Sequence, residues 1–169
     1  SRPTGWTVAG VSRTGRRPAN EDSILVGAPA GPRVRAVACV CDGMGGHNAG
    51  EVASAMAIES LKEWLAREDA LPSGSGPDDT ARIEEAVRAW VVATNGRILD
   101  ATTDRPDHHG MGTTLALALV VGERRLVVAN VGDSRIFLVR GLRVTQVSVD
   151  HTVLAEQERL LGKDAPLLE

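Results

Sequence analysis

Residues 34–65, VRAVACVCDGMGGHNAGEVASAMAIESLKEWL, form the segment that decides the fold. The run from Val34 to Cys41 is apolar and rich in valine, which predicts a strand buried on both faces. Small and apolar residues then recur at the 3.6-residue period, which predicts an amphipathic helix over 49–65. The stripe consists of Ala49, Val52, Ala53, Met56, Ala57, Ser60, Leu61, Trp64 and Leu65. The segment therefore predicts a strand, a tight loop and a helix.

Asp42 ends the predicted strand and is followed by glycines at 43, 45 and 46. A carboxylate there is costly to desolvate unless a cation or hydrogen bonds compensate it. The glycines let the backbone fold tightly, so that carbonyl oxygens can share the ligand, and oxygen-only ligation suits Mg²⁺ or Mn²⁺. Taken alone, the segment also allows Asp42 to cap a turn. A dinucleotide-binding loop is disfavoured, because G-x-G-x-x-G fails at residue 48, an asparagine.

Composition narrows the class of protein. The chain has 169 residues, enough for one domain, and 19 basic against 22 acidic residues give a net charge of −3. The charges are interspersed, which predicts no nucleic-acid or anionic membrane partner. With no run of 18 apolar residues and no signal-peptide pattern, we expect no membrane segment and no export. Cys39 and Cys41 alternate on one strand and predict a buried, reduced pair, as in a reducing cytoplasm.

Seven strands and two helices are predicted in chain order. The strands are expected at 6–12, 23–28, 34–41, 113–121, 125–131, 135–139 and 143–149. The helices are expected at 49–65 and from Asp78 or Asp79 to about Thr103, and a further amphipathic segment begins near Thr152. Blocks of strands, helices and hairpins indicate an α+β fold, and the apolar strands indicate two sheets packed face to face with helices outside.

Three acidic clusters fall at the ends of predicted strands. Glu21-Asp22 precedes one strand, Asp42 follows another, and Asp133 lies between two more. If these ends converge, the acidic pocket stays ionised only when cations occupy it. Arg17 is the obvious anion-binding group nearby, since its guanidinium matches phosphate oxygens bidentately. Two metal ions beside one guanidinium suit in-line attack of an activated water on a phosphate.

Five motifs resemble, in order, those of the metal-dependent protein phosphatases, the PPM or protein phosphatase 2C family, and its bacterial branch in particular. They are RPANED (17–22), VCDGMGGHNAGEVAS (40–54), GMGTTL (110–115), NVGDSR (130–135) and SVDHT (148–152). The resemblance implies a four-layer αββα sandwich of two antiparallel sheets flanked by helices. It also implies a binuclear Mn²⁺ or Mg²⁺ centre acting on phosphoserine and phosphothreonine.

The resemblance also implies roles for individual residues. Asp42 would bridge both metal ions, and the Gly43 carbonyl would bind the second ion. Glu21 and Asp22 would hold that second ion directly or through waters. Arg17 would hold the substrate phosphate, and Asp133 would bind a third, weaker metal ion found in bacterial relatives. For Thr113 and Thr114 we expect a structural role only, as hydroxyls at the start of a strand.

Histidines are not expected to take part. Animal members of the family carry a histidine directly after the D-G pair, whereas this chain and bacterial members have a methionine, here Met44. We expect His47 to be part of the loop structure, His108 and His109 to be solvated, and His151 to start a helix.

The resemblance is incomplete at the end of the chain. Family members continue with S-D-G and D-N motifs that complete the first and third metal sites, and neither occurs after His151. Residues 1–169 are therefore expected to form the N-terminal two-thirds of one catalytic domain, with weak or absent activity alone. The alternative is a catalytically incomplete module that binds or regulates.

The expected partners are phosphorylated proteins, substrates of a bacterial Ser/Thr kinase. A serine hydrolase using Ser134 is excluded, because GDSRI lacks the second glycine of a nucleophile elbow.

Overall fold

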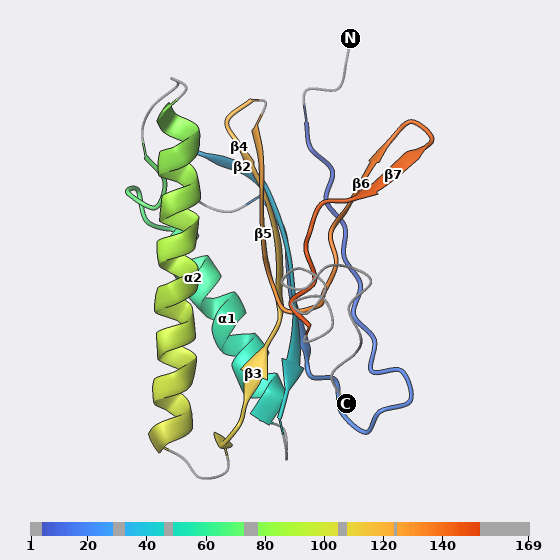
Figure 1. The fold of residues 1–169 in the computed structure, drawn as a ribbon, viewed down its shortest axis with the longest axis vertical. Coiled ribbons are helices and arrows are strands. Elements are labelled where there is room, and N and C mark those ends of the chain that lie inside the picture. Colours follow the sequence, from blue (N-terminus) through green and yellow to red (C-terminus); the bar gives the residue numbers. More distant parts are fainter. Residues whose placement is uncertain are drawn as a thin grey trace, which may run out of the picture.

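The computed structural model describes residues 5–28, 33–45, 49–72, 78–104, 108–123 and 125–152. Two helices, α1 (Ala49–Leu65) and α2 (Asp78–Asp104), cover one face of an antiparallel sheet (Figure 1). The N-terminal segment and a two-stranded hairpin lie on the other side of that sheet. The described residues thus form one helical layer, one five-stranded sheet and one two-stranded sheet.

The larger sheet has the order β1-β2-β4-β5, with the short β3 paired to the end of β2. Its strands are β1 (Asp22–Gly27), β2 (Val34–Met44), β3 (Gly112–Thr113), β4 (Leu115–Val121) and β5 (Arg125–Val131). The second sheet pairs β6 (Phe137–Arg140) with β7 (Arg143–Gln146). All of these pairs are antiparallel, which confirms the α+β fold class.

The strand β2 is central because β1 and β4 both pair with it. Its side chains alternate, so that Val37, Cys39 and Cys41 are buried against the helices while Val40 is 44% exposed. Burial on both faces was expected; on the face away from the helices Ala36 is buried, but Ala38 is only partly buried and Val40 is exposed. Cys39 and Cys41 are free thiols, as predicted, with 3.8 Å between their sulfurs. The Cys41 thiol and burial together raise the pKa of Cys39.

The core lies between the helices and the sheet. Its fully buried large side chains include Leu61 of α1, Ile83 of α2, and Leu117 and Leu119 of β4. The rings of Trp64 and Trp90 stack with centroids 5.4 Å apart, which joins the two helices. Within the described ranges, no helix has the length and apolar character needed to cross a membrane.

Both helices were predicted closely, and so was β5, whereas some strand predictions were wrong. Residues 6–12 belong to neither sheet, since they pair with none of the described strands. The strand expected at 113–121 is divided into β3 and β4 at Thr114. The strand expected at 135–139 is found at Phe137–Arg140, and the strand expected at 143–149 ends at Gln146. The amphipathic segment after Thr152 lies outside the described residues.

Candidate active site

The aspartates of β1 and β2 lie opposite each other. In the antiparallel register, Asp22 is the partner of Asp42, which places both carboxylates at the same end of the sheet. Ser12 donates a hydrogen bond from its hydroxyl to Asp22 Oδ2 at 3.3 Å, and this contact ties the N-terminal segment to the pair. Like charges opposite each other on neighbouring strands repel, so the arrangement needs a compensating cation or proton.

The pKa of Asp42 is raised above its ordinary value. The main cause is partial removal of water from the carboxyl, followed by the negative charge of Asp22 and, more weakly, that of Asp133. The positive charge of Arg17 acts in the opposite direction. Four of the predicted site residues therefore interact electrostatically, although they come from three separate parts of the sequence.

Arg17 offers its guanidinium to solvent. Its side chain is 72% exposed, and its Nη1 lies 3.8 Å from Glu21 Oε2, a contact too long and too exposed to hold the group firmly. Glu21 is only 21% exposed by its side chain. A mobile guanidinium beside a sheltered carboxylate is well placed to receive an anionic ligand.

The end of β2 and the start of α1 approach each other closely at Gly43 and Gly50. A Cβ atom on Gly43 would lie 2.0 Å from the Gly50 carbonyl oxygen and 2.6 Å from that of Glu21. The Glu21 carbonyl accepts hydrogen bonds from Gly43 N at 3.1 Å and Ser54 Oγ at 2.7 Å. Only glycine fits here, and the contact holds Glu21 against both elements.

Asp133 lies in the loop between β5 and β6, and hydrogen bonds fix this loop on both sides. Gly132, at a φ of 89°, precedes it in a conformation that favours glycine. The Gly132 amide donates to His151 Nδ1 at 3.3 Å, and the His151 amide donates to the Gly132 carbonyl at 3.0 Å. Ser134 follows and lies 2.7 Å, Oγ to Oγ1, from Thr114.

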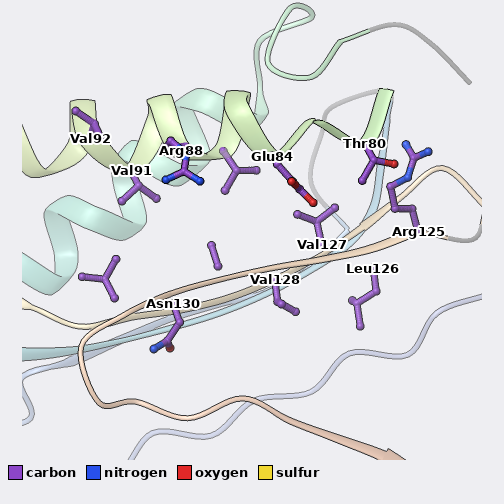
Figure 2. Close-up of a pocket in the computed structure, with 13 residues that line it drawn as sticks. Thr80, Glu84, Arg88, Val91, Val92, Arg125, Leu126, Val127, Val128 and Asn130 are labelled. Atoms are coloured by element: carbon purple, nitrogen blue, oxygen red, sulfur yellow. The ribbon is translucent and has the colours of Figure 1, made fainter. Parts of the chain in front are cut away.

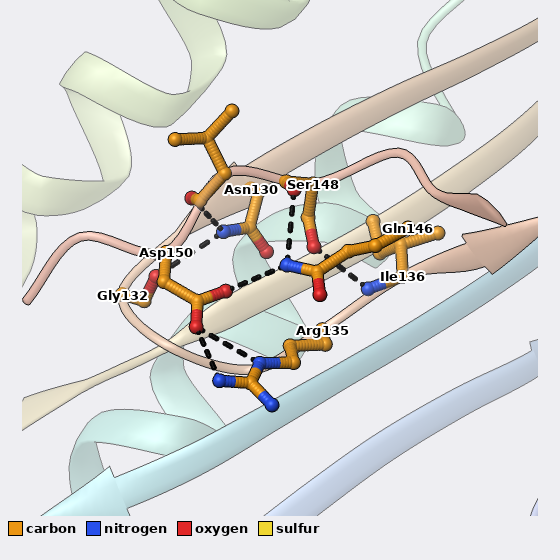
Figure 3. Close-up of polar contacts among 8 residues, drawn as sticks. Asn130, Gly132, Arg135, Ile136, Gln146, Ser148 and Asp150 are labelled. Carbon is orange, nitrogen blue, oxygen red and sulfur yellow. Dashed lines mark hydrogen bonds and ion pairs between the residues drawn. The ribbon is translucent and has the colours of Figure 1, made fainter. Parts of the chain in front are cut away.

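A polar network continues from this loop to the segment after β7 (Figure 3). Arg135 donates from Nε and Nη2 to Asp150 Oδ2, at 2.8 and 2.6 Å. Gln146 donates to the other oxygen of Asp150 at 2.8 Å. The Arg135 guanidinium lowers the pKa of Asp150 and so keeps that carboxylate ionised.

A complete metal centre is not assembled by these residues. In the part of the chain that the structure describes, no group of three or more His, Cys, Asp or Glu side chains is close enough to hold a metal ion. The donor set nevertheless fits a hard cation, since Asp22, Asp42 and Asp133 offer only oxygen and mutual repulsion raises the pKa of Asp42. The fit is that of a partial site that lacks further ligands.

Some polar residues around the site were given no such contacts from the sequence. Arg135 and Asp150 stand in motifs that carry the resemblance but were assigned no role, whereas Thr114 was expected to be structural and His151 to start a helix. Their hydrogen-bond partners depend on the loop after β5, and the motifs gave no signal for those contacts.

The methionine and histidines occupy different surroundings. Met44 is 64% exposed at the end of β2, where its backbone pairs with Gly112. His109 is exposed as expected, whereas His108 is partly buried, because the turn before β3 shelters it. His47 lies outside the described residues, and so does any helix that His151 would start.

One cavity lies apart from the acidic residues. It has a volume of about 570 Å³ and lies between α2 and β5, where Glu84 and Arg88 face Val127 (Figure 2). None of the predicted site residues lines it. The acidic end of the sheet is therefore the better candidate for chemistry.

The comparisons with known proteins match most of the chain. A family model described as protein phosphatase 2C matches residues 6–160. The serine/threonine protein phosphatase PstP of Mycobacterium tuberculosis is 40% identical over 149 residues, which are 86% of this chain and 26% of the relative. The serine/threonine phosphatase stp of Listeria monocytogenes is 36% identical over 120 residues, 71% of this chain and 45% of the relative.

Solved structures share the fold. The serine/threonine phosphatase Stp1 from Staphylococcus aureus has a TM-score of 0.75 at 27% identity, over 94% of this chain and 59% of that one. The Mycobacterium tuberculosis phosphatase PstP/Ppp has a TM-score of 0.64 at 36% identity, over 86% of this chain and 55% of that one. The chain thus spans less than half the length of the two sequence relatives named above and under two-thirds of these solved chains.

Proposed function

The chain belongs to the protein phosphatase 2C family, and from this premise we propose that it forms part of a metal-dependent protein serine/threonine phosphatase. The observation that carries the proposal is the register that places Asp22 opposite Asp42 at one end of the sheet, where the charges of Arg17 and Asp133 also act on Asp42. An anion-binding guanidinium beside mutually repelling carboxylates suits hydrolysis of a phosphate ester at divalent cations. The named phosphatase relatives support the same activity.

The family depends on metal ions, and we propose that Mn²⁺ or Mg²⁺ occupies this site. Asp42 would contact two ions, the Gly43 carbonyl, Glu21 and Asp22 would hold the second, and Asp133 would hold a third. When bound, the ions supply the Lewis acidity that activates a water for attack on phosphorus. Residues 1–169 would form the N-terminal two-thirds of a single catalytic domain, and the remaining ligands would come from its other part.

The residues of this chain then have separate tasks. The Arg17 guanidinium binds and orients the phosphate oxygens of the substrate, because it is exposed and only loosely paired with Glu21. Asp22 and Asp42 neutralise the cations at the end of the sheet. The Gly43–Gly50 contact keeps the carboxylates at a fixed distance from α1. The substrates would be phosphorylated proteins, targets of a bacterial Ser/Thr kinase in the cytoplasm.

Replacing Arg17 with alanine is expected to raise the KM for a phosphothreonine peptide by about 10-fold or more while kcat changes less. Such a result indicates the loss of an interaction made equally in the ground state and the transition state. Steady-state kinetics on the complete catalytic domain that contains residues 1–169, called the full chain from here on, measures both constants. Arg16→Ala, at the neighbouring exposed arginine, is the matched control and should leave KM unchanged. Equal KM values for the two variants would remove Arg17 from phosphate binding.

A module without catalysis is the second candidate. It is the alternative that the motif pattern left open, and the named phosphatase relatives do not favour it. The retained acidic residues favour the enzyme, because repelling carboxylates have no use in a module that binds no cation. Mn²⁺-dependent turnover of the full chain decides between the two.

A further inference from the structure

Thr114 joins the two aspartate-bearing segments. Its backbone amide donates to the Asp42 carbonyl at 2.9 Å, and its Oγ1 accepts the Asp42 amide at 3.0 Å. Because this oxygen accepts from Asp42, its own hydrogen can be donated to Ser134 Oγ, 2.7 Å away. The Thr114 hydroxyl therefore links the backbone of Asp42 to Ser134, the residue that follows Asp133.

The methyl group of Thr114 makes a second contact with the same loop. A Cβ on Gly132 would lie 2.8 Å from Thr114 Cγ2, so the loop backbone lies directly against the methyl group. Gly132 and Ser134 flank Asp133 on either side. Thr114 thus contacts both neighbours of Asp133, by packing on one side and by a hydrogen bond on the other.

The opposite side of the loop is anchored by other groups. Arg135 is held by Asp150, and the Ile136 amide donates to Ser148 Oγ at 2.9 Å (Figure 3). These contacts position the loop relative to the β6–β7 hairpin. Among the side-chain hydrogen bonds of the described residues, the Thr114–Ser134 bond is the one that links this loop to a residue bonded to Asp42.

We propose that Thr114 is a positioning residue whose hydroxyl, through Ser134, sets the placement of Asp133 relative to Asp42. The inference rests on the proposed function, since the placement matters for cations that the two carboxylates hold. It assigns Thr114 a role beyond that of a hydroxyl at the start of a strand. Groups that orient metal ligands typically change metal affinity or activity by about 10- to 100-fold when removed.

The chain offers a matched pair of substitutions for the test. Thr114→Val keeps the methyl groups and the shape but removes the hydroxyl, whereas Thr114→Ser keeps the hydroxyl and removes the methyl. In the full chain, Thr114→Val is expected to raise the Mn²⁺ concentration for half-maximal turnover by about 10- to 100-fold. Thr114→Ser is expected to stay close to the wild-type value. Equal effects of both substitutions would overturn the inference.

A double-mutant cycle shows whether Thr114 acts through Asp133. In an Asp133→Asn background, Thr114→Val is expected to cause little further change in the Mn²⁺ requirement, because the group it positions is gone. Additive effects would mean that Thr114 acts independently of Asp133 and would overturn the inference.

Amide hydrogen exchange separates this inference from the proposed function, since it needs no metal ion and no substrate. Thr114→Val, unlike Thr114→Ser, is expected to speed exchange both at the Asp42 amide and at the Gly132 and His151 amides of the loop. Faster exchange at Asp42 alone would show that the hydroxyl does not hold the loop, and would overturn the inference. If the wild-type full chain shows no turnover but the variants show this exchange pattern, the proposed function is refuted while the positioning role of Thr114 stays supported.

Discussion

Replacing Asp42 with asparagine is expected to reduce Mn²⁺-dependent hydrolysis of a phosphothreonine peptide by the full chain to the background rate. The charges of Asp22, Asp133 and Arg17 all act on the Asp42 carboxylate. An amide keeps the shape but removes the negative charge that a divalent cation requires. Turnover as a function of Mn²⁺ concentration is the measurement, and Asp100→Asn on the exposed face of α2 is the control.

The same substitution should not unfold the protein. The pKa of Asp42 is raised in the folded state, so the folded protein favours the protonated carboxyl. The stability that this carboxyl contributes at low pH is lost as the pH rises through that pKa. Asp42→Asn in metal-free protein is therefore expected to melt at or above the wild-type temperature at pH 7. The difference should shrink as the pH falls through the raised pKa of Asp42 and the carboxyl becomes protonated. A large drop in melting temperature at pH 7 would contradict this electrostatic picture, and unchanged turnover would contradict the metal assignment.

Replacing Gly43 with alanine is expected to cost about 3 kcal/mol of unfolding free energy, the upper end of the range for overpacked sites. The new Cβ would meet the carbonyl oxygens of Gly50 and Glu21 at 2.0 and 2.6 Å. Both are backbone atoms of packed elements, so neither can rotate away as a flexible side chain could. Because Glu21 moves with this contact, turnover should fall as well. Chemical denaturation measures the stability change.

Gly96→Ala is the matched control for this prediction. Gly96 lies inside α2, and nothing lies within 4 Å of the Cβ it would gain. Alanine there is expected to stabilise the helix by up to about 1 kcal/mol. If Gly43→Ala and Gly96→Ala had similar effects, the close approach of α1 to the end of β2 would be wrong.

The helices and the central strands could be predicted because their patterns are local. The period of the apolar stripe and the valine run fix α1 and β2 without any knowledge of neighbours. Residues 6–12 could not be predicted in the same way, since an extended alternating segment becomes a strand only when another strand pairs with it. The division at Thr114 likewise depends on its bonds to Asp42, 72 residues away.

The candidate site was predictable as a set of carboxylates but not as an arrangement. Strand ends beside glycines pointed to Asp22, Asp42 and Asp133, and the register of β1 on β2 agrees with this for the first two. The residues that hold Asp133 could not be derived, because Thr114 and Asp150 bond to Ser134 and Arg135 of this loop from two other segments. Side-chain hydrogen bonds between distant segments produce no periodic pattern in the sequence.

The most direct test of the central claim is the turnover of a phosphothreonine peptide by the full chain, measured with Mn²⁺, after chelation and after Mn²⁺ is restored. We expect hydrolysis that depends on Mn²⁺ concentration, disappears with the chelator and returns with the metal. Hydrolysis that persists after chelation, or no hydrolysis at any Mn²⁺ concentration, would contradict the account of a metal-dependent phosphatase.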